Sequence, residues 1–131
     1  MSKKLIIVGS GNAALCAGIS ALEKGATVKI LEKANENLAG GNTKYTAGAM
    51  RFVYNNGEEL KPLLKDPLDP KLEKTNFGQY TKEKFSEDLL NFNDGKPLTI
   101  EQKTLINESY ETMKWLSSHD VKFEPIYQRQ S

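Results

Sequence analysis

The sequence predicts an α/β fold that begins with a β-α-β unit and continues into a loop and helices. Three observations predict it: an apolar run close to the N-terminus, a helix-favouring stretch after it, and a run with alternating β-branched residues after that. These runs follow one another within residues 4–32, in the order of a parallel strand, a crossover helix and a second parallel strand.

Both predicted strands have the residue pattern of a parallel sheet. Leu5–Val8 is a continuous apolar run bounded by Gly9, which is typical of a strand covered on both faces. Thr27–Leu31 alternates with period two and is rich in β-branched residues. Two such strands need neighbours on both sides, and the sequence shows no convincing third βα unit. We therefore expect this chain to be the N-terminal portion of a longer protein.

The helix between the strands is predicted over Asn12–Lys24, and Gly25 supplies its C-terminal stop. Its large apolar residues recur at helical spacing, which supports the helix. They are Leu15, Ile19 and Leu22.

Four further segments are predicted after the β-α-β unit. Residues 33–56 are rich in Gly, Asn, Ala and Thr and predict a loop that packs closely on something, followed by a short helix. Residues 57–80 contain three prolines among charged residues and predict an exposed loop. A helical region is predicted over 81–118, and the start of a strand over 121–126.

Two helices are predicted within 81–118. The first places Phe85, Leu89 and Phe92 on one face. The second runs from about residue 100 to 118 and is opened by Thr99 with Gln102 three residues later, the spacing of a capping box. Its expected apolar stripe is Leu105, Met113 and Leu116, with Ile106 and Tyr110 beside it.

Composition excludes several classes of protein. Eighteen Lys+Arg against seventeen Asp+Glu leave a formal net charge of +1, so we expect no nucleic acid and no anionic membrane as partner. One cysteine excludes an internal disulfide framework, and no apolar run approaches the roughly 20 residues that span a bilayer. The N-terminus lacks the pattern of a signal peptide. The expected setting is cytoplasmic.

A glycine-rich turn follows the first predicted strand. Gly9, Gly11 and Ala14 match G-x-G-x-x-G/A at the start of a helix, the context in which this pattern indicates a Rossmann-like dinucleotide site. The first Gly makes the turn, the second admits a pyrophosphate to the helix N-terminus, and the third position needs a small residue. Glu32 follows Gly11 by 21 residues, where a carboxylate binds a ribose 2′-hydroxyl and repels a 2′-phosphate.

Other readings of single residues stay open. A glycine-rich strand-to-helix turn without a ligand is the alternative for VGSGNAAL. Cys16 is expected to be a small packed residue of the helix, and His119 a cap or a solvated imidazole rather than a catalytic group. Lys44 and Arg51 would orient a carboxylate substrate or be solvated.

Since FAD and NAD share this pattern, the choice depends on the residues that follow, LEKANENLAGGNTKYTAGAMR. Here the chain resembles the fumarate reductase and succinate dehydrogenase flavoprotein superfamily. There a GSGNAAL-like turn, a strand ending in LEK, a GGNS or GGNT element and a nearby Ala-Gly recur in this order. With the later KWL and VKFEPIYQRQS, the chain is most similar to the FAD-dependent tricarballylate dehydrogenase type.

The resemblance implies a role for each matching residue. Gly9, Gly11, Asn12 and Ala13 would meet the FAD pyrophosphate, Glu32 the adenosine ribose, and Lys33 the adenine side. Gly41, Asn42 and Thr43 would meet the diphosphate and ribityl chain, with Ala47 and Gly48 close to the isoalloxazine. For GGNT, a surface turn is the alternative. Residues 33–56 contain no histidine, so the FAD is expected to be non-covalent.

The resemblance also implies a function: hydride transfer between flavin N5 and a small polycarboxylate or related unsaturated acid. The catalytic residues and capping region of the family lie beyond the length of this chain, so no catalytic residue is assigned and the chain alone is expected to be inactive. The electron acceptor is unknown. Three alternatives stay open: the NAD-binding domain of a dehydrogenase, a non-catalytic truncated fragment, and a flavoenzyme resembling 3-ketosteroid dehydrogenase.

Overall fold

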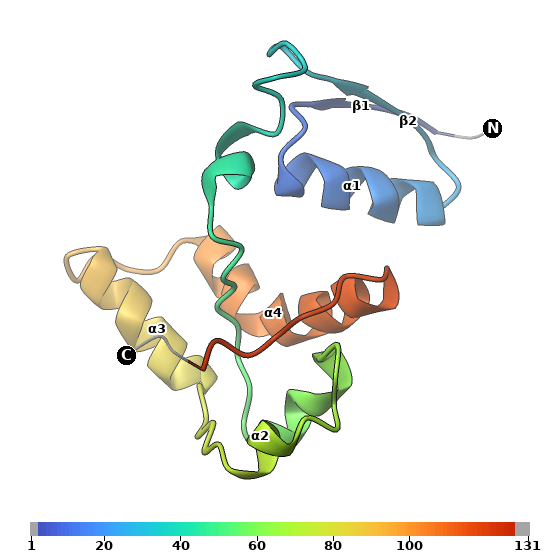
Figure 1. The fold of residues 1–131 in the computed structure, drawn as a ribbon. Coiled ribbons are helices and arrows are strands. Elements are labelled where there is room, and N and C mark those ends of the chain that lie inside the picture. Colours follow the sequence, from blue (N-terminus) through green and yellow to red (C-terminus); the bar gives the residue numbers. More distant parts are fainter. Residues whose placement is uncertain (1–2, 128–131) are drawn as a thin grey trace. The chain divides into compact units, whose positions relative to one another are not determined.

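A computed structural model describes residues 3–127, so the QRQS that ends the quoted C-terminal motif lies outside the described residues. The chain divides into two compact units, Met1–Met50 and Arg51–Ser131. The predicted fold is confirmed, because a parallel β-α-β unit comes first and helices follow (Figure 1).

The first unit is built on strand β1 (Lys4–Val8), helix α1 (Asn12–Glu23) and strand β2 (Thr27–Leu31). The strands pair in parallel, with Lys4 opposite Thr27 and Val8 opposite Leu31. Helix α1 lies along one face of this two-stranded sheet (Figure 1). The chain then continues into a short 3-10 helix, η1 (Gly41–Tyr45), which carries the GGNT element.

Helix α1 packs on the sheet through small residues. Ala14 and Gly18 are its buried residues, and a Cβ atom at Gly18 would lie 3.5 Å from Ile7 Cδ1. The larger residues Leu15, Ile19 and Leu22, which share helical spacing, are 38–55% exposed. Two strands offer a narrow surface, which the small residues of α1 already fill within the described part of the unit.

The second unit begins with structure where the sequence predicted an exposed loop over 57–80. Two 3-10 turns, η2 (Gly57–Glu59) and η3 (Lys61–Leu63), are followed by the short helix α2 (Pro70–Glu73). Leu63 and Leu72 are buried. Pro62 and Pro70 lie in the first turns of η3 and α2, where the missing N–H costs no hydrogen bond. The prolines therefore begin these turns and do not prevent them.

Two longer helices make up most of the second unit, α3 (Lys82–Phe92) and α4 (Ile100–Ser118). Thr81 caps α3, and the predicted capping box of α4 is confirmed, because Thr99 and Gln102 exchange both hydrogen bonds. Val53, Phe85 and Ile106 form the core, and Tyr80, Leu89 and Leu98 pack against it.

The buried face of each helix differs in part from the predicted one. On α3, Phe85 is buried as expected, but Phe92 is 84% exposed. On α4, Ile106 and Met113 are buried, whereas Leu105 is 48% exposed. Leu105 and Ile106 are adjacent and both apolar, so the sequence pattern alone does not show which of them faces the core. In the structure, Ile106 faces the core.

The strand start predicted over 121–126 is also corrected. A single parallel bridge joins Leu64 to Phe123, supported by the Lys65 N–H donating to the Phe123 carbonyl at 2.9 Å. No regular strand forms among the described residues of this segment. The neighbouring chain is the tight turn η3, which cannot extend a ladder.

We expect Ile106→Ala to lower the free energy of unfolding of the second unit by about 2–4 kcal/mol, because it leaves a cavity in the core. Leu105→Ala, its half-exposed neighbour on the same helix, should cost under about 1 kcal/mol. Urea denaturation followed by Trp115 fluorescence measures both, since this only tryptophan lies on α4. Equal losses from the two variants would contradict the assigned core.

Candidate functional site

Three segments of the first unit come together next to the end of the sheet. They are the turn after β1 (residues 9–11), the residue after β2 (Glu32), and the loop at residues 40–43. The Gly9 N–H donates to the Leu31 carbonyl at 2.7 Å, which extends the pairing of the strands by one residue. The residues that follow each strand therefore lie side by side.

Gly9 and Gly11 serve two different purposes. Gly9 has φ +95°, a conformation that favours glycine, and a Cβ atom there would meet nothing within 4 Å. Gly11 has φ −75°, which any residue adopts, but its Cβ would lie 3.3 Å from both the Gly40 carbonyl oxygen and Thr43 Oγ1. The small size of Gly11 thus admits the loop at residues 40–43.

Some backbone N–H groups at the N-terminus of α1 make no hydrogen bond within the described residues. Its N-cap, Gly11, has no side chain, and the Asn12 N–H donates to Thr43 Oγ1 at 3.1 Å. Leu15 makes the first intrahelical bond, to the Gly11 carbonyl at 3.0 Å. Within the described chain, the N–H groups of Ala13 and Ala14 have no protein acceptor. Such groups, at the positive end of a helix dipole, suit a phosphate.

Ser10 joins all three segments. Its hydroxyl donates to Glu32 Oε2 at 2.5 Å and accepts the Gly40 N–H at 3.0 Å. Ser10 was not among the predicted site residues. Its position between the two glycines placed it at the site, but nothing in the sequence shows that its side chain turns toward Glu32.

Glu32 is exposed, and both of its carboxylate oxygens already accept hydrogen bonds. Oε2 accepts from Ser10, and Oε1 accepts the Ala34 N–H at 2.8 Å. The Ser10 hydroxyl, and then the Ala34 N–H, hold the pKa of Glu32 below its ordinary value. Glu32 is therefore a fixed, ionised carboxylate at neutral pH.

The loop with GGNT turns tightly because of its glycines. Gly40 and Gly41 have φ +105° and +55°, and Asn42 and Thr43 follow within η1. Lys44 donates to the Asn37 carbonyl and so closes the loop. The structure brings Gly11, Asn12 and Thr43 together, whereas no hydrogen bond of the described residues joins Lys33, Ala47 or Gly48 to them.

The remaining candidates have structural partners. Arg51 NH1 lies 2.8 Å from Asp88 Oδ2 and 3.0 Å from the Tyr80 hydroxyl, and Tyr80 and then Asp88 raise the pKa of Arg51. Its charge is therefore balanced within the second unit. His119 is the C-cap of α4, with Nδ1 2.8 Å from the Trp115 carbonyl oxygen, and Cys16 is half-buried in α1.

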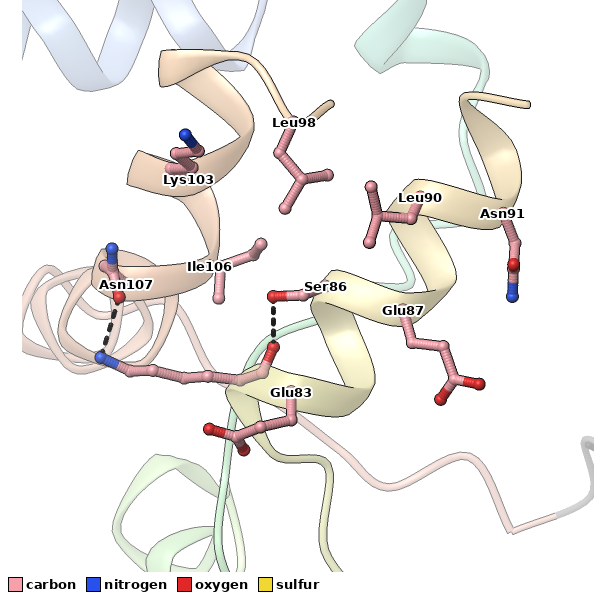
Figure 2. A pocket seen from close by; sticks show the side chains of 10 residues that line it. Glu83, Ser86, Glu87, Leu90, Asn91, Leu98, Lys103, Ile106 and Asn107 are labelled. Atoms are coloured by element: carbon pink, nitrogen blue, oxygen red, sulfur yellow. Dashed lines mark hydrogen bonds between the residues drawn. The ribbon is translucent and has the colours of Figure 1, made fainter. Parts of the chain in front are cut away.

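A groove of about 620 Å³ lies between α3 and α4 in the second unit (Figure 2). Leu90, Leu98 and Ile106 point into it, and Lys82, another lining residue, donates to Asn107 Oδ1 at 3.0 Å. Among the described residues, no group of three or more His, Cys, Asp or Glu side chains could hold a metal ion. None of the helices in residues 3–127 is long and apolar enough to cross a membrane.

A parallel β-α-β unit with a glycine turn after its first strand is typical of the start of a dinucleotide-binding domain. Residues 4–68 match the family described as FAD binding domain. Just under half of the chain is therefore similar to FAD-binding domains.

Two similar curated proteins are both fumarate reductases (cytochrome), one from Shewanella frigidimarina and one from its strain NCIMB 400. Each is 38% identical over 63 residues, which is 48% of this chain. The chain spans about a tenth of their length, 11% and 10%. No solved structure matches significantly.

We expect Gly11→Ala to push the loop at residues 40–43 away from α1, because the new methyl group lies 3.3 Å from two loop oxygens. The Asn12 N–H would then lose its Thr43 acceptor and exchange with solvent faster, by about fivefold for a bond of ordinary strength. Hydrogen exchange measured by NMR reports this amide directly.

Gly18→Ala is the matched control on the same helix. Its methyl group would make ordinary contacts of 3.5–3.6 Å, and alanine favours the helix by about 0.5–1 kcal/mol. Protection of the Asn12 amide should be kept. An Asn12 amide that exchanges at the wild-type rate in both variants would contradict the close contact between Gly11 and the loop at residues 40–43.

Glu32 should make the first unit sensitive to acid. Because the folded pKa is lowered, the stabilisation is complete above the ordinary glutamate value of about 4.3 and is lost as the pH falls through the folded value. Between about pH 6 and pH 3, the protection of the β1 amides from hydrogen exchange should decrease in the wild type, and it should decrease less in Glu32→Gln. Glu36→Gln, in the same exposed loop, should follow the wild type; acid sensitivity unchanged in Glu32→Gln would contradict this.

Proposed function

We propose that this chain is the N-terminal portion of an FAD-dependent oxidoreductase and that residues 9–48 bind the cofactor without a covalent bond. The observation that carries the proposal is the meeting of the Gly9–Gly11 turn, Glu32 and the GGNT loop within one unit. The family match over residues 4–68 supports FAD as the dinucleotide.

The diphosphate would lie at the N-terminus of α1, over Gly9, Gly11 and Asn12. The unpartnered N–H groups of Ala13 and Ala14 are donors suited to its oxygens. Thr43 accepts the Asn12 N–H, which leaves its own hydroxyl hydrogen for a phosphate oxygen. Gly41 and Asn42 would lie along the diphosphate and ribityl chain.

The adenosine ribose would bind at Glu32. An ionised carboxylate offers about four acceptor positions, and Ser10 and Ala34 use two, one on each oxygen. The carboxylate is exposed, so two adjacent ribose hydroxyls would donate to its outward-facing lone pairs. Lys33 would lie near the adenine, and Ala47 and Gly48 near the isoalloxazine, where small residues admit a flat ring.

Bound FAD supplies hydride transfer at its flavin ring, and the residues of this chain bind and orient it. The similar proteins are named fumarate reductases, so we propose a small polycarboxylate or related unsaturated acid as substrate, including the tricarballylate type. Arg51 is paired with Asp88 and is not proposed to bind it. The catalytic groups would lie outside these residues, so this chain alone should be inactive.

The proposal predicts that FAD co-elutes with the longest natural form of the protein and that Gly41→Leu abolishes this retention. Gly25→Leu is the matched control, because both glycines have positive φ and an open Cβ position, but Gly25 lies in the turn between α1 and β2. Visible absorption after gel filtration measures retained flavin. Measurable NAD affinity without retained FAD would contradict the proposal and favour a nicotinamide-binding domain.

A further inference from the structure

We propose that Ser10 is a positioning residue, whose hydroxyl holds the Glu32 carboxylate and the loop at residues 40–43 in the arrangement that receives the adenosine half of the cofactor. The inference rests on the proposed function and deepens it. It names a residue that the glycine pattern leaves unspecified, since Ser10 occupies the variable position of G-x-G.

The direction of the two hydrogen bonds is fixed by chemistry. A hydroxyl group has one hydrogen and two lone pairs, and a backbone N–H can only donate. Because Gly40 donates to Ser10 Oγ at 3.0 Å, the single hydroxyl hydrogen points to Glu32 Oε2, 2.5 Å away. Both hydrogen bonds therefore point in the same direction, with Gly40 donating to Ser10 and Ser10 donating to Glu32, and each bond polarises the next.

This chain of bonds restrains an exposed side chain. A glutamate on a surface ordinarily samples many rotamers, and a ligand must order it on binding. Here Ser10 holds one carboxylate oxygen and Ala34 the other. The carboxylate plane is therefore set before the ribose arrives, and the lowered pKa keeps it ionised.

Ser10 also fixes the loop that crosses the N-terminus of α1. The Gly40 N–H bond to Ser10 and the Asn12 N–H bond to Thr43 hold that loop at two points. The Gly40 carbonyl oxygen lies 3.3 Å from the position that a Cβ atom of Gly11 would take. A shift of Gly40 would therefore move the loop away from the N-terminus of α1. Loss of the Ser10 hydroxyl should therefore loosen both the ribose and the diphosphate ends of the site.

The test compares Ser10→Thr with Ser10→Val, two side chains of equal shape that differ in the hydroxyl. NMR titration gives the pKa of Glu32, and hydrogen exchange gives the protection of the Gly40 amide, both in the cofactor-free chain. The Val variant should raise the Glu32 pKa and speed Gly40 exchange about fivefold relative to the Thr variant. Ser10→Ala should behave as Val does. Ser86→Ala, which loses a hydroxyl bond within α3, should change neither value.

The same variants test the link to the cofactor. Ser10→Val should weaken FAD binding about fivefold or more relative to Ser10→Thr, and should weaken it by a smaller factor in a Glu32→Gln background, where only the bond to Gly40 remains to be lost. Additive losses would overturn the claim that Ser10 acts through Glu32. Equal Glu32 pKa and Gly40 exchange in the Thr and Val variants would overturn the positioning role itself. Failure of the wild type to bind FAD would instead overturn the proposed function, while the cofactor-free measurements still decide whether Ser10 holds Glu32.

Discussion

The parallel pairing of β1 with β2 is the constraint on which the first unit depends. Parallel strands end at the same edge of a sheet, so the turn after β1 and the residue after β2 must lie together. The bond from Gly9 to Leu31 continues this pairing beyond the strands. The next residue on each side is then Ser10 and Glu32, which are joined by a hydrogen bond. The candidate ribose site is thus a direct consequence of strand register.

The β-α-β unit could be predicted from the sequence because its signals are local. Both strands and α1 were predicted close to their observed bounds, and the capping box of α4 at its observed residues. The role of Ser10 could not be predicted, because it depends on the side-chain direction at a turn. The buried residues of the helices could not be predicted exactly either, because they depend on the surface against which each helix packs. Gly18 is buried on α1, and Ile106 is buried on α4. The prolines of 57–80 gave the wrong expectation because their position within a turn decides their effect.

The second unit uses a polar contact inside its core. The Val53 N–H donates to Ser109 Oγ at 3.0 Å, and Ser109 is 6% exposed. A buried N–H without a partner would cost about 1–3 kcal/mol, so this serine fixes the segment after Arg51 on α4. The Arg51 pair with Asp88 adds less, about 0.2–1 kcal/mol, because Arg51 is 64% exposed. The ion pair nevertheless gives Arg51, which the sequence offered for substrate binding, a structural partner.

We propose that the first unit binds FAD through the N-terminus of α1, Glu32 and the GGNT loop. Mapping the backbone amide signals of the protein during titration with FAD tests it most directly. We expect the largest shifts at Ala13, Ala14, the Ser10–Glu32 pair and Gly41–Thr43, with the α3 and α4 amides unchanged. Shifts confined to the groove between α3 and α4, with the α1 N-terminus unaffected, would contradict it.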